Sequence, residues 1–280
     1  MRQFSLRNKN GAEYSFMDTS HWLSAPKGLG EKFGSSYVQV GSTFVRTKKR
    51  TNPDNITGTV LISGGATTEY ELYNAFLAFA QHEPLTLVYN PYGTEYTAKV
   101  DIVKIDKGEV AQADGLLHIP VTFKRLTRWR REITKHTDAD ETVGKQYTYE
   151  YPYAYGGDVV NNVTIQSDTA CESPCKIYII GACTNPVWKH YVNGNLVATG
   201  ALTVSTTANE RIVIDTTTIP YSIKKFDNNG NELLDLYATS DFSTERFCFL
   251  EHGTNRFAIG HDGLNDLELA VEAQLEYESV

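Results

Sequence analysis

A single helix in a strand-rich chain is the feature that most constrains the fold. Between Thr68 and Gln81, large apolar side chains recur at steps of three and four residues, as they do on one face of a helix: Tyr70, Tyr73, Phe76, Leu77 and Ala80. Thr68 and Glu71 have the spacing of a capping box, in which a hydroxyl and a carboxylate satisfy the free amide groups of a helix start. We therefore predict a helix over residues 68–81, with its aromatic face packed in a core rather than around a cofactor.

The residues around this helix alternate between polar and apolar side chains with the period of two that is typical of strands. We predict strands at residues 37–45, 57–62, 85–89, 96–105 and 116–123. The longer segment from Lys32 to Arg50 is also strand-like and ends in basic residues, and we interpret it as an arm or hairpin that reaches a neighbouring subunit. The first half is thus predicted to be an antiparallel β domain with one packed helix.

The second half carries no helix pattern. Short strand-like runs alternate with turn signals such as Asn193-Gly194, whose two residues tolerate the positive φ of a tight hairpin turn. Short strands at this spacing are typical of a sandwich or jelly roll. The polar stretch 136–146 separates the halves. We predict an N-terminal domain at 1–135, a linker at 136–146 and a C-terminal β-sandwich at 147–280.

Charge is divided unevenly between the halves. Residues 1–135 have a net charge of +5 and residues 136–280 a net charge of −13, within a chain of net charge −8. The acidic half repels nucleic acid, and the basic residues of the first half are scattered or lie at strand ends, so we expect no nucleic-acid partner. No apolar run approaches the roughly 20 residues of a membrane-spanning helix, and residues 1–7 lack a signal-peptide core. We expect neither membrane insertion nor secretion.

The residues that could carry chemistry do not form a recognisable pattern. No nucleotide-binding loop, dinucleotide fingerprint or nucleophile elbow is present. His252 and His261 lie near three carboxylates (Glu251, Asp262 and Asp266), but polar loops are the favoured interpretation. Residues 227–231 lack the full pattern of a calcium loop and are interpreted as a polar hairpin turn. We therefore predict no catalytic residues, no cofactor and no metal, and a protein that is not an enzyme.

The four cysteines also give no indication of a metal site. Cys171 and Cys175 have no histidine at ligand spacing, which disfavours zinc. Cys183 and Cys248 are expected to be small buried thiols, and a disulfide stays open because sequence cannot pair the four cysteines.

An alternative function comes from the aromatic residues of the second half. Rings on a β-sandwich can stack on sugar faces, and the candidates are Tyr149, Tyr151, Tyr153, Tyr155, Trp188 and Tyr191. The same rings could instead fill the sandwich core or line a subunit contact. Recognition of a cell-wall polysaccharide by the C-terminal sandwich is thus the competing hypothesis.

The order of several short motifs resembles a known family. In the first half these are Pro26–Gly30, the helix with Tyr73, Phe76 and Phe79, and then Leu87–Gly93, Val103–Glu109, Val121–Phe123 and Thr127–Trp129. In the second half they are Asn185–Trp188, Asn193-Gly194, Ile212–Asp215 and Phe249–Asn255. In this order and spacing the chain resembles the distal tail protein (Dit) family of long-tailed, non-contractile bacteriophages.

The resemblance implies a structural hub at the tip of a phage tail. Members form a hexameric ring through their N-terminal domains, and the C-terminal domain is a galectin-like sandwich. One face of the ring meets the tail tube protein and the other the tail-associated lysin or tail spike protein. The C-terminal domains can carry receptor-binding proteins of the baseplate. The expected location is the virion, after synthesis in the cytoplasm of the host bacterium.

Overall fold

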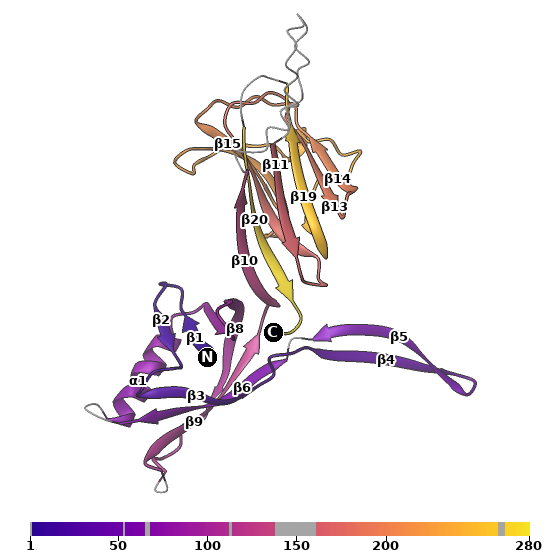
Figure 1. Ribbon diagram of the computed structural model, residues 1–280. Helices are drawn as coiled ribbons and strands as arrows, with labels where there is room; N and C mark the ends of the chain where they lie inside the picture. Colours follow the sequence, from indigo (N-terminus) through magenta and orange to yellow (C-terminus); the bar gives the residue numbers. More distant parts are fainter. Residues whose placement is uncertain (1, 53, 65–67, 112–113, 138–160, 263–266) are drawn as a thin grey trace, which may run out of the picture. The chain divides into compact units, whose positions relative to one another are not determined.

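The computed structural model describes residues 2–52, 54–64, 68–111, 114–137, 161–262 and 267–280. These residues form two compact units, which are described separately. The first unit contains Met1–Arg131 together with Tyr277–Val280, and the second contains Glu132–Glu276. The chain therefore leaves the first unit once and returns to it at its last four residues (Figure 1).

The first unit is an antiparallel sheet covered by one helix. Pairing between neighbours gives the strand order β2–β1–β7–β8–β9–β6–β3, and each pair is antiparallel. The bounds of these strands are β1 Gln3–Arg7, β2 Glu13–Ser15, β3 His21–Lys27, β6 Asn55–Ser63, β7 Leu85–Asn90, β8 Tyr96–Ile105 and β9 Leu116–Arg125. Strand β10 (Trp129–His136) pairs with β8 through Arg130 and Thr97, and it carries the chain into the second unit.

Helix α1 (Glu69–Ala80) confirms the predicted helix to within one residue at each end. Thr68 is its N-cap: its hydroxyl accepts a hydrogen bond from the Glu71 amide at 3.3 Å, and the Glu71 carboxylate accepts one from the Thr68 amide at 3.0 Å. The helix buries Phe76 completely. The predicted face is rotated slightly, because Leu72, Tyr73 and Phe79 pack against the core while Tyr70 stays 37% exposed. The aromatic face is therefore core, as expected.

The core of the first unit lies between the sheet and α1. Phe16 contacts Phe76 and Phe123 edge to face, with ring centroids 6.1 and 6.3 Å apart. Phe4 stacks on Tyr89 at 4.6 Å. The C-terminal residues Tyr277 and Val280 pack against this same core. The alternating strands predicted from the sequence thus point their apolar side chains at one shared interior.

Two further strands of the first unit form a hairpin of their own. Strands β4 (Lys32–Val40) and β5 (Thr43–Asn52) pair with each other and with no other strand of the described chain. The sequence predicted one strand over residues 37–45, and the structure corrects this. The chain reverses at Gly41-Ser42, a two-residue loop whose Gly41 has a φ of +63°, the left-handed conformation that glycine adopts without a steric cost. The hairpin extends away from the sheet of its unit (Figure 1).

The second unit is a β-sandwich. One sheet has the strand order β17–β16–β15–β12–β20–β10, and the other has the order β11–β19–β13–β14. The bounds are β11 Asn161–Ser167, β12 Ser173–Ile180, β13 Val187–Val192, β14 Asn195–Ala201, β15 Glu210–Asp215, β16 Ser222–Asp227, β17 Glu232–Asp235, β19 Gly253–Gly260 and β20 Glu268–Tyr277. Short β18 (Phe249–Leu250) pairs with β12, and Tyr237–Thr239 forms a single 3-10 turn. In β12 every second residue is buried, so Cys175, Ile177 and Ile179 point between the sheets.

The predicted division of the chain stays a prediction, because residues 138–160 include most of the proposed linker and lie outside the described residues. Two features of the described part differ from that division. The boundary between the two units along the chain falls between Arg131 and Glu132, inside β10. Strand β10 itself continues to His136, where the linker was expected to begin. The last four residues also belong to the first unit rather than to the sandwich.

Candidate functional site

The β4–β5 hairpin presents large apolar side chains that no part of the described chain covers. Six of them are between 48% and 68% exposed: Phe33, Tyr37, Val38, Val40, Phe44 and Val45. Val38 pairs with Val45, and the neighbouring pair is Gln39 with Phe44. Because adjacent pairs of a hairpin point to opposite faces, valines occupy one face of the tip and aromatic rings the other. A two-stranded hairpin alone is marginally stable in water, so this arrangement calls for a partner.

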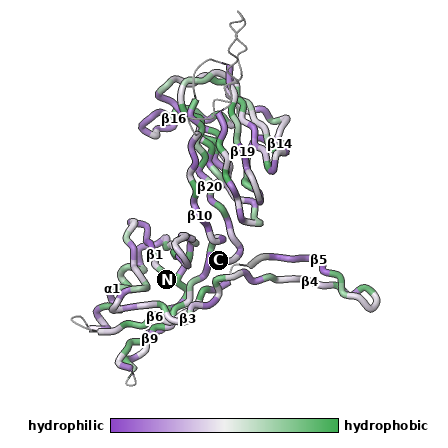
Figure 2. Tube along the Cα trace, in the orientation of Figure 1, coloured by the Kyte–Doolittle hydropathy of each residue, from purple (hydrophilic) through white to green (hydrophobic). Residues whose placement is uncertain are grey.

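The stem of the hairpin is basic. Arg46, Lys48, Lys49 and Arg50 follow one another along β5, and all are exposed. Lys49 places its ammonium nitrogen 4.2 Å from the centre of the Phe33 ring, a cation–π contact that holds this ring against the stem. Figure 2 shows most of β5 in the hydrophilic colour and the part of the hairpin next to the turn in the hydrophobic colour. The hairpin therefore combines an apolar tip with a cationic stem.

A buried ion pair lies at the root of the hairpin. Glu31 directly precedes β4, and its carboxylate accepts a hydrogen bond from the Arg125 guanidinium. Their side chains are 4% and 1% exposed. Burial raises the pKa of Glu31, and the positive charge of Arg125 opposes this rise. The Trp129 indole donates to the Leu29 carbonyl at 2.9 Å, so the segment that leads into β4 is tied to the unit by two buried contacts.

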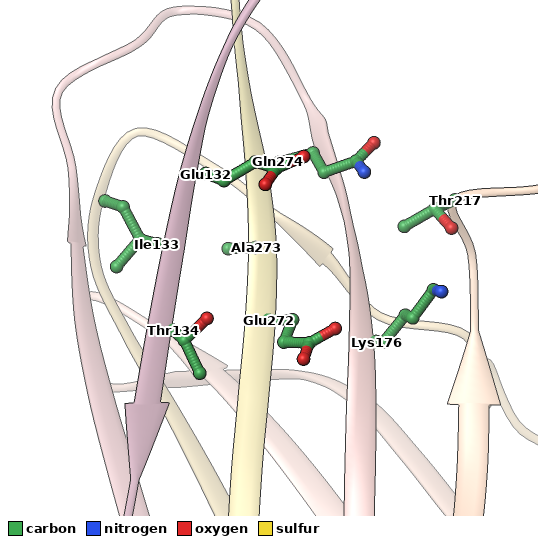
Figure 3. A pocket seen from close by; sticks show the side chains of 8 residues that line it. All are labelled: Glu132, Ile133, Thr134, Lys176, Thr217, Glu272, Ala273 and Gln274. Atoms are coloured by element: carbon green, nitrogen blue, oxygen red, sulfur yellow. The ribbon is translucent and has the colours of Figure 1, made fainter. Parts of the chain in front are cut away.

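A groove opens on the six-stranded sheet of the second unit. It has a volume of about 260 Å³ and is lined by residues of β10, β12 and β20 and by Thr217 after β15. Figure 3 shows the lining residues gathered around Ala273 of β20, with Ile133 and Thr134 on one side and Lys176 and Thr217 on the other. The remaining members are Glu132, Glu272 and Gln274. Sequence patterns did not predict this groove, because its residues come from strands that are far apart in the chain.

The predicted sugar-binding rings do not form a site among the described residues. Trp188 is 2% exposed, its indole donates to the Arg246 carbonyl at 2.9 Å, and its ring fills the space that a side chain at Gly200 would occupy. Trp188 is therefore a core residue. Tyr191 is covered by the Arg256 guanidinium, 4.1 Å from the ring centre. Tyr149, Tyr151, Tyr153 and Tyr155 lie outside the described residues.

The other polar candidates lie in loops and turns. Asp262 accepts a hydrogen bond from the Asn185 amide at 3.0 Å, the His252 carbonyl accepts one from Asn193, and Asp266 is outside the described residues. Asp227 accepts from the amides of Asn229 and Asn231 at 2.9 and 2.8 Å, the geometry of a polar hairpin turn. Within the described ranges, no three His, Cys, Asp or Glu side chains gather as metal ligands would.

The cysteines are buried thiols. All four are free and buried, and the Cys175 thiol contacts the Cys248 carbonyl at 3.3 Å. Burial raises the pKa of Cys175 to about 12 and raises that of Cys248 well above its usual range. Such thiols stay protonated near neutral pH, and a protonated thiol is a poor nucleophile.

No helix of the described chain has the length and apolar character needed to cross a bilayer.

Comparison with known proteins assigns the first unit to a domain family. Residues 3–126 match the family described as the N-terminal domain of distal tail proteins. None of the curated proteins compared with the chain matches it. Among solved structures, the phage p2 baseplate in its activated conformation with Sr matches over 100% of both chains, with a TM-score of 0.61 and 15% identity. The Dit (gp 19.1) protein of phage SPP1, described as a paradigm of hub adsorption apparatus in phages that infect Gram-positive bacteria, matches over 96% of this chain and 98% of its own, with a TM-score of 0.62 and 10% identity.

These matches extend across both units. At such low identity the solved structures show the fold, and the fold class is confirmed: mainly β, with an antiparallel N-terminal unit, one packed helix and a C-terminal β-sandwich. The domain match covers the sheet, the helix and the hairpin of the first unit. Residues 3–126 therefore form an N-terminal domain of the distal tail protein family, and the whole chain shares the fold of the two solved phage structures.

Proposed function

We propose that this protein is the structural hub of a phage tail tip. Six copies would close into a ring through their first units, joining the tail tube protein on one face to the tail-associated lysin or tail spike protein on the other. The second units would be free to carry receptor-binding proteins of the baseplate. In this proposal the protein is a structural component of the virion and not an enzyme, and it is made in the cytoplasm of the host bacterium. The family assignment of residues 3–126 supports it.

The observation that carries the ring is the β4–β5 hairpin. Apolar side chains on both faces of its tip have no cover within the described chain, so another polypeptide has to bury them. In a ring, each subunit offers one surface to the next and receives a different one in return. A protruding hairpin meets that requirement, because it belongs to one subunit and inserts into its neighbour. The hairpin is thus proposed as the arm between subunits.

The proposal is tested by mass and shape. Light scattering of the purified protein at increasing concentration is expected to approach six times 31.3 kDa, and negative-stain images are expected to show six-fold rings. If the protein alone stays monomeric, the ring is expected to form when the tail tube or spike protein of the same phage is added. A strict monomer at high concentration that also binds neither partner would contradict the proposal.

A further inference from the structure

The groove of the second unit contains a buried hydrogen-bonding group that has no partner among the described residues. The side-chain oxygen Oε1 of Gln274 is buried and accepts no hydrogen bond from the described residues. Buried polar atoms normally find a partner, because burying one without a hydrogen bond costs free energy. The Gln274 oxygen therefore indicates a ligand or ordered water in the groove. The side chains of Glu132 and Thr134, which also line the groove, are exposed and accessible to the same ligand.

Other lining groups are already held in place. The Tyr178 hydroxyl donates to Glu272 at 2.7 Å, which fixes that carboxylate at the edge of the groove. The Lys176 ammonium lies 3.6 Å from the Asp215 carboxylate, and Thr217 donates to the same carboxylate at 2.6 Å. These contacts orient Glu272 and Lys176 while leaving each with unused hydrogen-bonding capacity. The groove is thus partly organised before any ligand enters.

The charges of the lining exclude the simplest ionic ligands. Glu132 and Glu272 repel an anion such as phosphate. Lys176 lies among these carboxylates and repels a metal cation, and its ammonium offers hydrogen atoms where a cation needs lone pairs. A neutral ligand that both donates and accepts hydrogen bonds is compatible with the whole set.

Hydroxyl groups on adjacent carbon atoms have this property. A carboxylate or a primary amide is planar and presents two polar atoms side by side, so Glu132 and Gln274 can each engage a pair of neighbouring hydroxyls. Small-molecule pockets commonly measure about 300–1,000 Å³, so a groove of about 260 Å³ suits one ring rather than a long chain. We propose that this groove binds one neutral sugar residue of a saccharide, held by Glu132, Gln274, Lys176 and Glu272.

This proposal moves the sugar hypothesis away from the rings that the sequence indicated. Trp188 lies in the core, whereas the groove is lined by charged and amide side chains without an aromatic ring. Stacking on an aromatic face is therefore not part of the recognition. Without that contact, we expect weak binding of a single sugar, with a Kd on the order of 1 mM.

The test is titration of the isotopically labelled full-length protein with glucose, galactose, mannose and rhamnose, followed by NMR. These sugars differ in the orientation of their hydroxyls. We expect at least one to produce saturable shifts at Gln274 and its neighbours. Gln274→Ala and Glu132→Ala are each expected to weaken that binding about tenfold, the effect of losing one pair of hydrogen bonds. Lys224→Ala is the matched control, because Lys224 belongs to the same sheet but pairs with Glu232 outside the groove.

Thermal unfolding of each variant shows whether the sandwich is intact. Shifts that disappear in the two groove variants and persist in Lys224→Ala support the proposal. The absence of saturable shifts with all four sugars would overturn it, and so would shifts that the groove variants leave unchanged. Neither outcome depends on whether the protein forms a ring, because binding is measured on the chain in whatever assembly it adopts.

Discussion

At the scale of single residues, the Glu31–Arg125 pair makes the sharpest prediction of stability. Both side chains are almost completely buried, so removing one leaves the other charge without its partner. Breaking a buried ion pair in this way typically costs about 3–5 kcal/mol. We expect Arg125→Met to destabilise the first unit by an amount in this range, measured by urea unfolding of the full chain.

The double variant Glu31→Leu with Arg125→Met is the control for that measurement. It removes both charges, and replacing a buried pair by hydrophobic side chains of similar volume is often neutral or stabilising. It should therefore recover much of the stability that the single variant loses. Equal losses in the single and double variants would show that packing, rather than the unpaired charge, is responsible.

His190 makes the second prediction at this scale. Its ring is 1% exposed, stacks on Phe257 at 4.4 Å and shares a hydrogen bond of 3.1 Å with the Asn255 side chain. The Asn255 oxygen also accepts from the Glu251 amide, so His190 donates to it through Nε2. Burial lowers the pKa of His190 below its ordinary value of 6.5, although the hydrogen bond opposes this shift.

The sign of the pH dependence follows from that shift. In the unfolded chain a histidine titrates near about 6.5, so the unfolded state takes up the proton first as the pH falls. The contribution of His190 is therefore fully present above that pH and is lost as the pH falls toward the lower pKa of the folded state. Unfolding midpoints between about pH 7.5 and pH 5 should decline in the wild type. The decline should be shallower in His190→Gln, and identical slopes would contradict the assignment.

At the scale of elements, a substitution in the β4–β5 hairpin is expected to affect assembly without affecting the stability of the monomer. Phe44 is 68% exposed at its tip, and substitutions at exposed positions usually change stability by less than about 0.5 kcal/mol. Phe44→Asp is thus expected to leave the thermal midpoint of the monomer unchanged while abolishing the higher-mass species, because it places a charge in the proposed subunit contact.

Tyr92→Asp is the matched control for this variant. Tyr92 is an aromatic residue of the same unit, is 92% exposed and lies in the turn after β7. Sedimentation velocity of both variants gives the comparison. Loss of assembly in both would point to a general effect of added negative charge, and retention in both would remove the tip from the interface.

The elements also show which parts of the fold the sequence could predict. Helix α1 and the Asn193-Gly194 turn were predictable, because capping and positive φ are local: Asn193 and Gly194 have φ of 50° and 86°. Pro120 is also explained by a local rule, because a proline in a strand favours an edge or a bulge. Strand β9 lies between β6 and β8, but its pairing with β8 stops at Val121, so Pro120 lies at a local edge and has no ladder bond to donate on that side.

Contacts between segments that are distant in the chain could not be predicted from local sequence patterns. The return of Tyr277 to the first unit, where its ring meets Tyr96 at 5.2 Å, has no signal in the alternation of β20. The groove likewise brings together residues that are as far apart in the sequence as Glu132 and Gln274. Trp188 was assigned to the wrong environment, since a tryptophan is common both on a binding face and in a core, and only its burial distinguishes the two.

At the scale of the whole molecule, the distribution of charge makes the last prediction. The chain has a net charge of −8, yet the hairpin stem places Arg46, Lys48, Lys49 and Arg50 within five residues of one another. If each stem lies on an acidic neighbour, attraction offsets part of the repulsion between like-charged copies. Salt screens exposed charges over about 10 Å at 0.1 M. Raising NaCl from about 0.05 to 0.5 M should therefore lower the assembled fraction.

A variant with Lys48, Lys49 and Arg50 all changed to Gln isolates the contribution of the stem. It keeps the apolar tip and should assemble less readily at low salt, with a weaker dependence on salt than the wild type. The opposite result is equally informative. If apolar burial at the tip dominates, screening of the net repulsion strengthens assembly as salt rises, and the triple variant follows the wild type. Sedimentation velocity across the salt series distinguishes a hub closed by electrostatic contacts from one closed by the hairpin tip alone.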